Sequence, residues 1–360
     1  METKLRAWIS SANSAPLELV DLPAPVPAGS EVVVETEFCG VCHSDLHTWQ
    51  GVTDLGSRGK VTRPASAVPV AMGHEISGRV SAKGPDATGV EIGDRVIVYP
   101  WLGCGSCGPC TAGQDNMCIG VPRSLGFRAH GGFASQVVVP HPRYLVEVGD
   151  LDPALAATLA CSGLTVMSAI RKLMPLPADE PVVVIGAGGV GLQAIAVLRA
   201  MGHEVIISVD LREEKRALAI AEGATAFVPG GPGASERLTE VAGGKVGAVL
   251  DFVNNGETAT MAFDVLRKGG TMVQVGLFGG ELAVPLYLVA LQALTIRGSL
   301  TGTLEDLAAV VALARSGKLR AVPIERLPKD QINEAMLRLE RGEVSGRLVL
   351  QDTHACAACG

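Results

Sequence analysis

The chain of 360 residues has little of what marks a nucleic-acid-binding, disordered or secreted protein. Charged residues make up only 19% of it, the formal net charge is -7, and lysine and arginine form no block. This pattern argues against nucleic acid or an acidic membrane surface as a partner. The first residues lack the apolar core of a secretory signal, and no internal repeat or low-complexity segment is present. With 48% hydrophobic residues, the composition predicts a globular protein long enough for two domains.

Two stretches, residues 153–170 and 181–198, contain no charged residue and are long enough to be mistaken for membrane spans. Glycine occurs in both, and it clusters in the second, where a spanning helix would need continuity. We therefore expect buried core segments, no membrane partner and a cytoplasmic location.

The two halves of the chain differ in their pattern of predicted secondary structure. Short β-type runs broken by Gly and Pro, at 31–36, 78–81, 95–99 and 136–139, predict a twisted antiparallel, barrel-like β domain. From about residue 180, strand-like runs alternate with helix-like segments, which predicts βαβ units and a parallel sheet. The expected strands are 182–185, 204–209, 226–228, 247–252, 271–276 and 294–298, and the helix-like segments include 192–201 and 213–222. The tail, including 346–350, is expected to return to the first domain.

Four of the nine cysteines, Cys104, Cys107, Cys110 and Cys118, have the spacing C-x2-C-x2-C-x7-C in a glycine-containing stretch. Four thiolates this close in sequence can converge on a tetrahedral centre, the geometry of structural zinc sites. Disulfides are an alternative, but the rest of the chain is typical of intracellular proteins, where thiols stay reduced. An iron–sulfur cluster also uses four cysteines, although its usual spacings differ. The spacing favours structural zinc.

A G-x-G-x-x-G turn, formed by Gly186, Gly188 and Gly191, directly follows the run 182–185 and opens a helix-like segment. Such glycines allow a tight turn and the close approach of a pyrophosphate to the helix N-terminus. Asp210 ends the next expected strand at about 20 residues further on, where a carboxylate can bind the adenosine ribose. This charge would repel a 2′-phosphate and favours NAD, although Arg212 two residues later leaves NADP open.

Three further motifs contain candidate ligands for a second metal ion. Cys42 lies in GVCHSDLH, His74 and Glu75 lie in GHEISGRV, and Cys161 lies in LACSGLT. Each alone is more often structural, as a buried thiol or a hydrogen-bonded histidine. A catalytic zinc ion, however, needs three N, S or O ligands and one open position. Cys42, His74 and Cys161 could supply that set, with Glu75 as a neighbouring or exchangeable carboxylate.

In this order, the motifs resemble those of zinc-dependent alcohol dehydrogenases of the medium-chain dehydrogenase/reductase family, above all the bacterial and archaeal tetrameric type. The resemblance extends from GVCHSDLH to Gly346-Arg347 and so covers nearly the whole chain. It implies an α/β fold in which a Rossmann doubly wound parallel sheet is inserted into a GroES-like twisted β-barrel catalytic domain. Residues 1–150 and 299–360 would form the catalytic domain, with the zinc lobe at about 100–120, and 151–298 the NAD-binding domain.

Carried over residue by residue, the resemblance implies a full set of site residues. Cys42, His74 and Cys161 correspond to the catalytic zinc ligands, and Glu75 to a carboxylate that ligates the metal in some relatives. Asp45 matches the carboxylate that orients the histidine ligand, Ser44 and His47 match a proton relay, and Thr165 matches a nicotinamide contact. Asp210 and Lys215 match residues that bind the adenosine ribose. The residues matched to positions near the cofactor phosphates are His43, Gly186, Gly188, Gly189, Val190, Gly191 and Arg347.

The activity implied by the resemblance is reversible hydride transfer between an alcohol and NAD+, which gives an aldehyde or a ketone. The alcohol oxygen would take the open zinc position, which lowers its pKa, and its proton would leave through Ser44, the ribose hydroxyl and His47. Each chain would hold two zinc ions, one catalytic and one structural. The resemblance also implies a homo-oligomer, a tetramer in preference to a dimer, in which strand 294–298 pairs with its copy.

Some features leave the substrate open. Trp49 and Trp101 are candidates for the wall of an apolar pocket that takes aliphatic, cyclic or aromatic alcohols. The stretch 52–69 is longer than in many relatives and is either a loop beside the substrate cleft or a surface insertion. The terminal group of His354, Cys356 and Cys359 can bind metal or cycle its redox state, but such a short peptide is more often a tail.

Three other functions are compatible with parts of this pattern: a C=C reductase or a polyol dehydrogenase of the same family, and a non-catalytic NAD-binding protein. Ser44 and His47 argue against the reductase, because protonation at carbon needs no such relay. The four-cysteine lobe does not distinguish an alcohol dehydrogenase from a polyol dehydrogenase, because some polyol enzymes also have it. The complete set of zinc ligands argues against a non-catalytic role.

Overall fold

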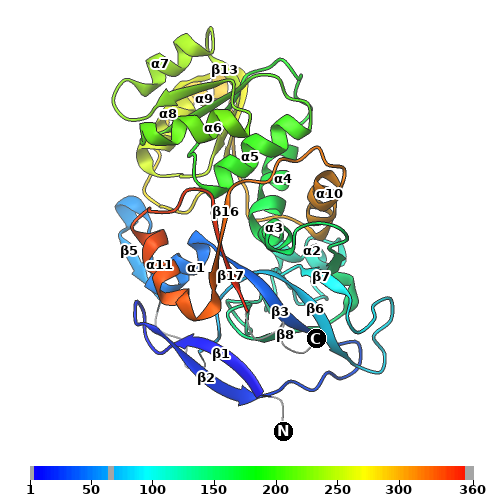
Figure 1. Ribbon diagram of the computed structural model, residues 1–360. Coiled ribbons are helices and arrows are strands. Elements are labelled where there is room, and N and C mark those ends of the chain that lie inside the picture. The colour runs from blue at the N-terminus through cyan, green and yellow to red at the C-terminus, as the bar shows by residue number, and fades with distance from the viewer. Residues whose placement is uncertain (1–3, 64–68, 353–360) are drawn as a thin grey trace.

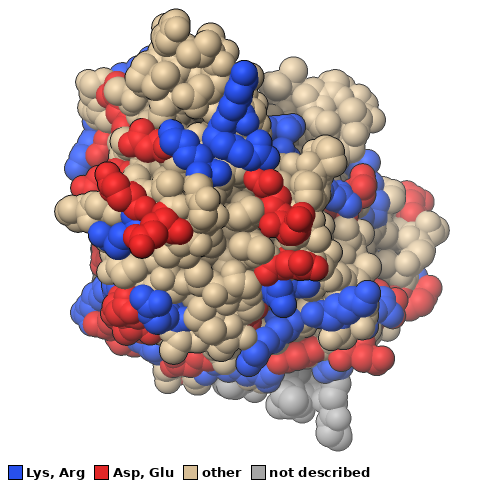
Figure 2. Space-filling model, turned by 90° about the horizontal axis from the view of Figure 1, so that it is seen from above, with Lys and Arg blue, Asp and Glu red and all other residues tan. Residues whose placement is uncertain are grey.

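Two large sheets organise the chain in the computed structural model, which describes residues 4–63 and 69–352. A six-stranded parallel sheet with its helices forms the upper part of Figure 1, and a seven-stranded mixed sheet forms the lower part. Seen from above, onto the parallel-sheet end, acidic and basic side chains are interspersed among uncharged ones (Figure 2).

The parallel sheet has the strand order β12-β11-β10-β13-β14-β15. Its strands are β10 (Val182–Ile185), β11 (Ile206–Asp210), β12 (Ala226–Pro229), β13 (Val246–Asp251), β14 (Leu266–Gln274) and β15 (Thr295–Gly298). This is the doubly wound order of dinucleotide-binding folds, whose ligand crevice lies at the carboxyl ends of the central strands. The predicted alternation is confirmed, although β14 begins earlier than expected because Leu266 already pairs with Val246.

Helices cover both faces of this sheet. They are α5 (Gly189–Ala200), α6 (Arg216–Glu222) after the 3-10 turn η5 (Glu213–Lys215), α7 (Ala234–Val241), α8 (Gly256–Asp264) and α9 (Leu286–Leu291). Val182 and Val184 pack in one core cluster with Leu192, whereas Val183 packs in a second cluster with Phe263. Burial on both faces explains why β10 is an unbroken apolar run.

The mixed sheet has the order β16-β17-β3-β6-β7-β9, and β8 pairs with β3. Its strands are β3 (Val32–Val41), β6 (Glu75–Lys83), β7 (Arg95–Val98), β8 (Gln136–Val139), β9 (Leu145–Glu147), β16 (Ile324–Pro328) and β17 (Arg347–Gln351). Two separate hairpins are formed by β1 (Lys4–Ser10) with β2 (Leu17–Pro23) and by β4 (Val52–Asp54) with β5 (Lys60–Thr62). As predicted, the C-terminal strand returns to the first half, because Leu350 pairs with Cys39.

Further helices complete the mixed-sheet part. They are α1 (His43–Gln50), η1 (Gly56–Arg58), α2 (Gly108–Thr111), η2 (Asp115–Met117), η3 (Pro142–Tyr144), α10 (Leu304–Arg315), η6 (Lys329–Gln331) and α11 (Ile332–Glu340). Pairing of Gly40 with Glu75 brings the end of β3 beside the start of β6. Cys42 and His74, which follow and precede these two positions, are thereby brought together.

The first uncharged stretch forms one helical run made of α3 (Pro153–Thr158), a π-helical turn η4 (Leu159–Gly163) and α4 (Leu164–Arg171). This run is long and apolar enough to cross a membrane by length and composition, but 94% of it is buried inside the protein. It is therefore a core helix. Its wide turn contains Cys161, and π-helical turns occur frequently at functional sites.

Candidate active site and metal centres

Cys42, His74 and Cys161 form a buried cluster whose ligand atoms all lie within 4.8 Å of one another. Cys42 precedes α1, His74 precedes β6, and Cys161 belongs to the π-helical turn, so three elements from distant parts of the sequence contribute. The Nε2 atom of His74 lies 3.3 Å from the Cys161 sulfur. One nitrogen and two sulfurs at this separation fit a zinc ion that keeps a fourth position open.

Asp45 holds the histidine of this cluster in place. Its Oδ1 atom lies 2.9 Å from His74 Nδ1 and accepts the backbone N–H of Gly73, while Oδ2 accepts the N–H of Cys42. Burial lowers the pKa of His74, but the Asp45 carboxylate outweighs this and raises the pKa well above its ordinary value. Because Nδ1 is engaged, Nε2 is the nitrogen presented to the cluster.

Glu75 lies beside the cluster and is not one of its ligand residues in the described chain. Its Oε2 atom accepts a hydrogen bond from the Arg347 guanidinium, and both side chains are buried. Burial raises the pKa of Glu75 to about 7, although the charge of Arg347 acts in the opposite direction. Oε1 has no hydrogen-bond partner among the described residues, so one carboxylate oxygen is left unpaired next to the metal cluster.

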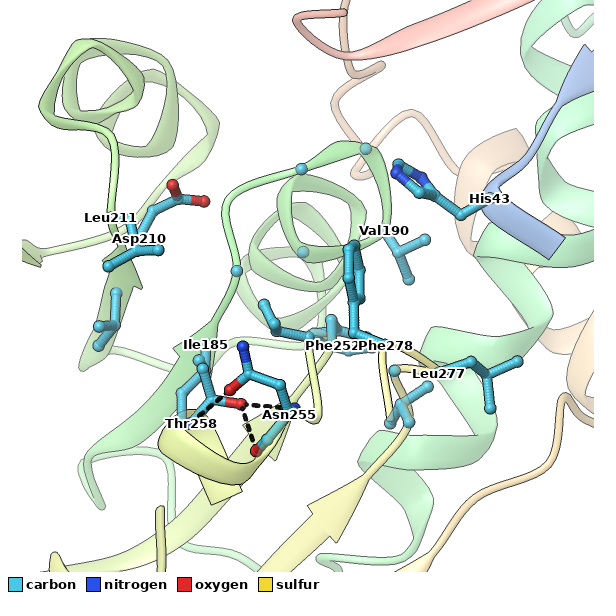
Figure 3. Close-up of a pocket in the computed structure, with 18 of the residues that line it drawn as sticks. His43, Ile185, Val190, Asp210, Leu211, Phe252, Asn255, Thr258, Leu277 and Phe278 are labelled. Atoms are coloured by element: carbon cyan, nitrogen blue, oxygen red, sulfur yellow. Dashed lines mark hydrogen bonds between the residues drawn. The ribbon is translucent and has the colours of Figure 1, made fainter. Parts of the chain in front are cut away.

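A cavity of about 1020 Å³ opens between the two sheets and is lined by residues from both. The G-x-G-x-x-G turn borders it at the start of α5 (Figure 3). A Cβ on Gly191 would lie 1.7 Å from the Gly186 carbonyl oxygen, so this position requires glycine for packing. A Cβ on Gly188, in contrast, would meet no atom within 4 Å. The open surface at Gly188 and the uncapped N-terminus of α5 fit a dinucleotide pyrophosphate.

Arg347, predicted to lie near the phosphates, does reach this turn. A Cβ on Gly189 would lie 2.5 Å from the Arg347 Cδ, and both residues line the cavity, as Val190 does. The arginine therefore lies between the Gly-rich turn and Glu75, and connects the cofactor cavity with the cluster of Cys42, His74 and Cys161.

Asp210 lies at the end of β11 and lines the same cavity. Its Oδ2 atom accepts hydrogen bonds from the backbone N–H of Ala187 at 2.7 Å and from Lys215 Nζ at 2.9 Å. The guanidinium of Arg212 donates instead to the carbonyl of Gly342. The two residues matched to the ribose are thus side by side, and the carboxylate charge is held at the cavity edge.

The residues matched to the relay and the nicotinamide also border the cavity, as does His43, which was matched to the phosphates. Ser44, His47, His43 and Thr165 all line it, and the Thr165 hydroxyl is buried without a partner in the described part of the chain. Burial lowers the pKa of His43 and of His47. The structure thereby brings these four side chains to the opening between the metal cluster and the Gly-rich turn.

Aromatic rings cover one side of His74. The ring centroids of Trp101 and Phe127 lie 5.3 and 5.0 Å from that of His74, and the two rings stack on each other. Neither Trp101 nor Phe127 is among the residues that line the cavity, so Trp101 contacts the histidine of the cluster and not the cavity itself. Sequence reasoning missed Phe127, because the loop that contains it has no recognisable motif.

Trp49 does not line the cavity, contrary to the prediction. It is buried in the core, and its indole N–H donates to the carbonyl of Ala15 at 2.7 Å. The helical period explains this placement: His43 and His47 are four residues apart and share a face of α1, whereas Trp49 projects from another side.

The four cysteines of the lobe form a second cluster within 4.8 Å. Sulfur–sulfur distances of 3.4 Å (Cys107–Cys110), 3.9 Å (Cys107–Cys118) and 4.0 Å (Cys104–Cys110) are too long for disulfides. They are close to the separation of about 3.8 Å that four Zn–S bonds of about 2.3 Å impose on a tetrahedron. Hydrogen bonds from the backbone and hydroxyl of Ser106 lower the pKa of Cys104 to about 6, which favours the thiolate.

Of the stretch 52–69, whose role the sequence left open, residues 52–62 form the hairpin β4–β5, and residues 64–68 lie outside the part of the chain that the structure describes. His354, Cys356 and Cys359 also lie outside it.

Comparison with known proteins decides the family. Residues 28–150 match the alcohol dehydrogenase GroES-like domain, and residues 189–316 match the zinc-binding dehydrogenase domain. An NAD-dependent alcohol dehydrogenase of Sulfurisphaera tokodaii is 37% identical over 346 residues, which cover 93% of this chain and 96% of the relative. The chain belongs to the zinc-dependent alcohol dehydrogenase family.

Two further similar proteins carry different names. The crystal structure of the alcohol dehydrogenase from Aeropyrum pernix has a TM-score of 0.85 and 31% identity, and covers 96% of this chain and 99% of that one. A D-arabinose 1-dehydrogenase (NADP(+)) of Saccharolobus solfataricus is 32% identical over 96% of this chain and 97% of its own length. The predicted family and the combination of GroES-like and Rossmann folds are confirmed.

Proposed function

We propose that the chain is a zinc- and NAD-dependent alcohol dehydrogenase that oxidises an alcohol to an aldehyde or ketone, and catalyses the reverse reaction. One observation carries this proposal: the two thiol ligands Cys42 and Cys161 open onto the same cavity as the Gly-rich turn and Asp210. A metal-binding cluster and a dinucleotide site that share one cavity are what direct hydride transfer requires.

In this proposal Cys42, His74 and Cys161 hold a catalytic zinc ion, and the four lobe cysteines hold a second, structural one. When bound, the catalytic zinc supplies a Lewis acid that polarises the substrate C–O bond. Asp45 orients His74, while Ser44 and His47 carry the alcohol proton toward solvent. Asp210 and Lys215 hold the adenosine ribose, which favours NAD over NADP.

The proposed substrate is an uncharged, moderately apolar alcohol. Trp101 and Phe127 stack on each other, are tilted to the ring of His74, and form an apolar surface beside the metal-binding cluster. Their rings exclude water from the reacting atoms, which strengthens every electrostatic interaction at the site.

The proposed domain division follows the sheets, with residues 1–150 and 299–360 in the catalytic domain and 151–298 in the NAD-binding domain. We also place the protein in the cytoplasm, because seven thiol groups in the two clusters and in Cys39 are free and a reducing compartment keeps them so.

The proposed assembly is a homo-oligomer, a tetramer in preference to a dimer. The edge strand β15 is exposed along its length, and nearby α9 exposes Leu286 (80%), Tyr287 (74%) and Leu291 (57%). Pairing of β15 with its copy would cover both the open edge and these side chains. Light scattering that finds only a monomer at micromolar concentration would rule this assembly out.

The decisive experiment measures NADH formation from NAD+ across primary, secondary, cyclic and benzylic alcohols. Because a D-arabinose dehydrogenase is among the relatives, polyols, D-arabinose and NADP+ belong in the same panel. Cys42→Ala and His74→Ala should abolish turnover and leave NADH binding nearly intact, since neither side chain is needed to hold the dinucleotide. Wild-type turnover in either variant would refute the zinc assignment, and a preference for sugars would shift the proposal to a polyol dehydrogenase.

A further inference from the structure

The β4–β5 hairpin, from the stretch that sequence reasoning left open, contacts the loop that follows β14 in the parallel-sheet part. The backbone N–H of Ser57 donates to Glu281 Oε2 at 2.8 Å. Hydrogen bonds from Ser57 lower the pKa of Glu281 below its ordinary value. The hairpin follows α1, and the loop follows β14; α1 and this loop both contribute residues to the cavity lining, so the contact joins the mixed-sheet part to the parallel-sheet part beside the cavity.

Glycine on each side allows the two backbones to approach closely. Gly56 has φ +64°, and a Cβ there would lie 2.6 Å from the Glu281 Cβ. Gly279 has φ +87°, and a Cβ there would lie 2.5 Å from the carbonyl oxygen of Asp54. Both positions combine left-handed backbone with a lack of space, so any other residue would push the hairpin and the loop apart.

The same loop presents Phe278 to the cavity. The Phe278 ring centroid lies 5.7 Å from that of His43 and 5.9 Å, edge-on, from that of His47. Figure 3 shows His43 and Phe278 together at the pocket lined by the Gly-rich turn. Phe278 is still 52% exposed, which places it at the mouth of the cavity. The loop is therefore held at two points, by α1 through Phe278 and by the hairpin through Glu281.

We propose that the β4–β5 hairpin is a latch that holds Phe278 across the mouth of the cavity and slows the release of NADH. The identity of the ligand rests on the proposed function. Release of a dinucleotide bound between two walls requires the walls to separate, and contacts that join them must break first. Phe278 and Glu281 are thus positioning residues that act on how long the cofactor stays bound.

A matched pair of glycine variants in the hairpin tests the latch. Gly56→Ala places a methyl group against Glu281, whereas Gly59→Ala has a similar positive φ (+85°) but no atom within 4 Å of its Cβ. Both variants strain the hairpin backbone, and only the first disturbs the contact with the loop. Glu281→Ala removes the same contact from the opposite side, with Glu240→Ala on the exposed surface of α7 as its control.

The measurement is the NADH dissociation rate of the zinc-loaded protein, followed by stopped-flow fluorescence. We expect Gly56→Ala and Glu281→Ala to release NADH about five-fold faster, the effect of losing a hydrogen bond of typical net strength. Gly59→Ala and Glu240→Ala should stay within about two-fold of wild type, because neither substitution places an atom against the loop or removes the hydrogen bond between Ser57 and Glu281. Equal rates in all variants, or the same acceleration in Gly56→Ala and Gly59→Ala, would overturn the latch.

Hydrogen exchange of residues 276–281 in the cofactor-free protein separates this inference from the proposed function. Gly56→Ala and Glu281→Ala should speed exchange in this loop, and Gly59→Ala should not. Equal exchange in all variants refutes the latch even in an active dehydrogenase. A wild-type protein that binds no NADH refutes the proposed function and with it the effect on release.

Discussion

The Nδ1 atom of His74 lies 2.9 Å from the Oδ1 atom of Asp45, and neither side chain is accessible to solvent. The carboxylate also caps α1 by accepting the N–H of Cys42, so one side chain orients two ligand residues of the cluster. A helix cap and a metal site therefore depend on the same residue.

Asp45→Asn should weaken zinc binding about 10- to 100-fold, the usual cost of losing such a partner of a metal-bound histidine. The amide has one acceptor oxygen in place of two and no charge, so it cannot satisfy His74 and both backbone N–H groups. Competition with a chelator measures the affinity. Asp152→Asn, at an exposed carboxylate paired with Arg326, is the control. Unchanged affinity would limit Asp45 to capping the helix.

Ser44→Ala should slow alcohol oxidation several-fold or more, because the proton loses its first acceptor. An unchanged rate at every pH would remove Ser44 from the relay.

His47 adds a pH dependence whose sign follows from its environment. Burial lowers its pKa below the ordinary value of 6.5, so the neutral ring that can accept a proton prevails at pH 7. As the pH falls through this lowered pKa, the ring becomes protonated and alcohol oxidation should decline. His47→Gln should be slower and should lack this acid limb in a profile of kcat against pH. The same acid limb in the variant would assign the titration to another group.

Cys107→Ser should lower the thermal stability of the protein before it lowers the catalytic rate. The lobe is held by four sulfurs that converge on one centre, so the loss of one ligand should lower the zinc content from two to one per chain and the Tm by about 5 °C or more. Elemental analysis and calorimetry measure the two effects. Gln114→Ala, at an exposed position in the same lobe, should change neither. Full zinc content with an unaltered Tm in Cys107→Ser would contradict a structural metal site.

Asp210→Ser should reduce the preference for NAD over NADP by about tenfold or more, because the carboxylate at this position binds the ribose hydroxyls and repels a 2′-phosphate. The ratio of kcat/KM for the two cofactors is the measure. Glu213→Gln, in the same loop and paired with Arg216 on the surface, serves as the control. A ratio that does not change would place cofactor selection elsewhere.

The metal and nucleotide motifs were predictable because each is a local pattern with its own chemistry. The C-x2-C-x2-C-x7-C spacing brings four thiolates together within one loop, and the G-x-G-x-x-G turn needs only a strand before it and a helix after it. Cys161 was less predictable, since a thiol in an apolar helix is usually core, and only its combination with Cys42 and His74 singled it out. Glu75 was matched to a carboxylate near the metal that ligates it in some relatives, and in the structure its partner is Arg347.

The aromatic residues show the limit of such reasoning. Trp49 and Trp101 are equally apolar in the sequence, yet the indole of Trp49 is buried in the core and donates to the carbonyl of Ala15, whereas the ring of Trp101 contacts that of His74. Phe127 and Phe278 lie in loops without a motif, so nothing local indicated that their rings would reach His74 and the two histidines of α1.

The sequence by itself determined the family, the alternation that builds the parallel sheet and the four-cysteine set of the lobe, because periodicity and short spacings act through neighbouring residues. Only the tertiary structure decided which side chains meet. The pairing of β3 with β6 and the π-helical turn join Cys42, His74 and Cys161, and the contact between Gly56 and Glu281 closes the hairpin onto the Phe278 loop. These contacts connect residues far apart in the chain, and their distances depend on how whole elements pack, which no local pattern encodes.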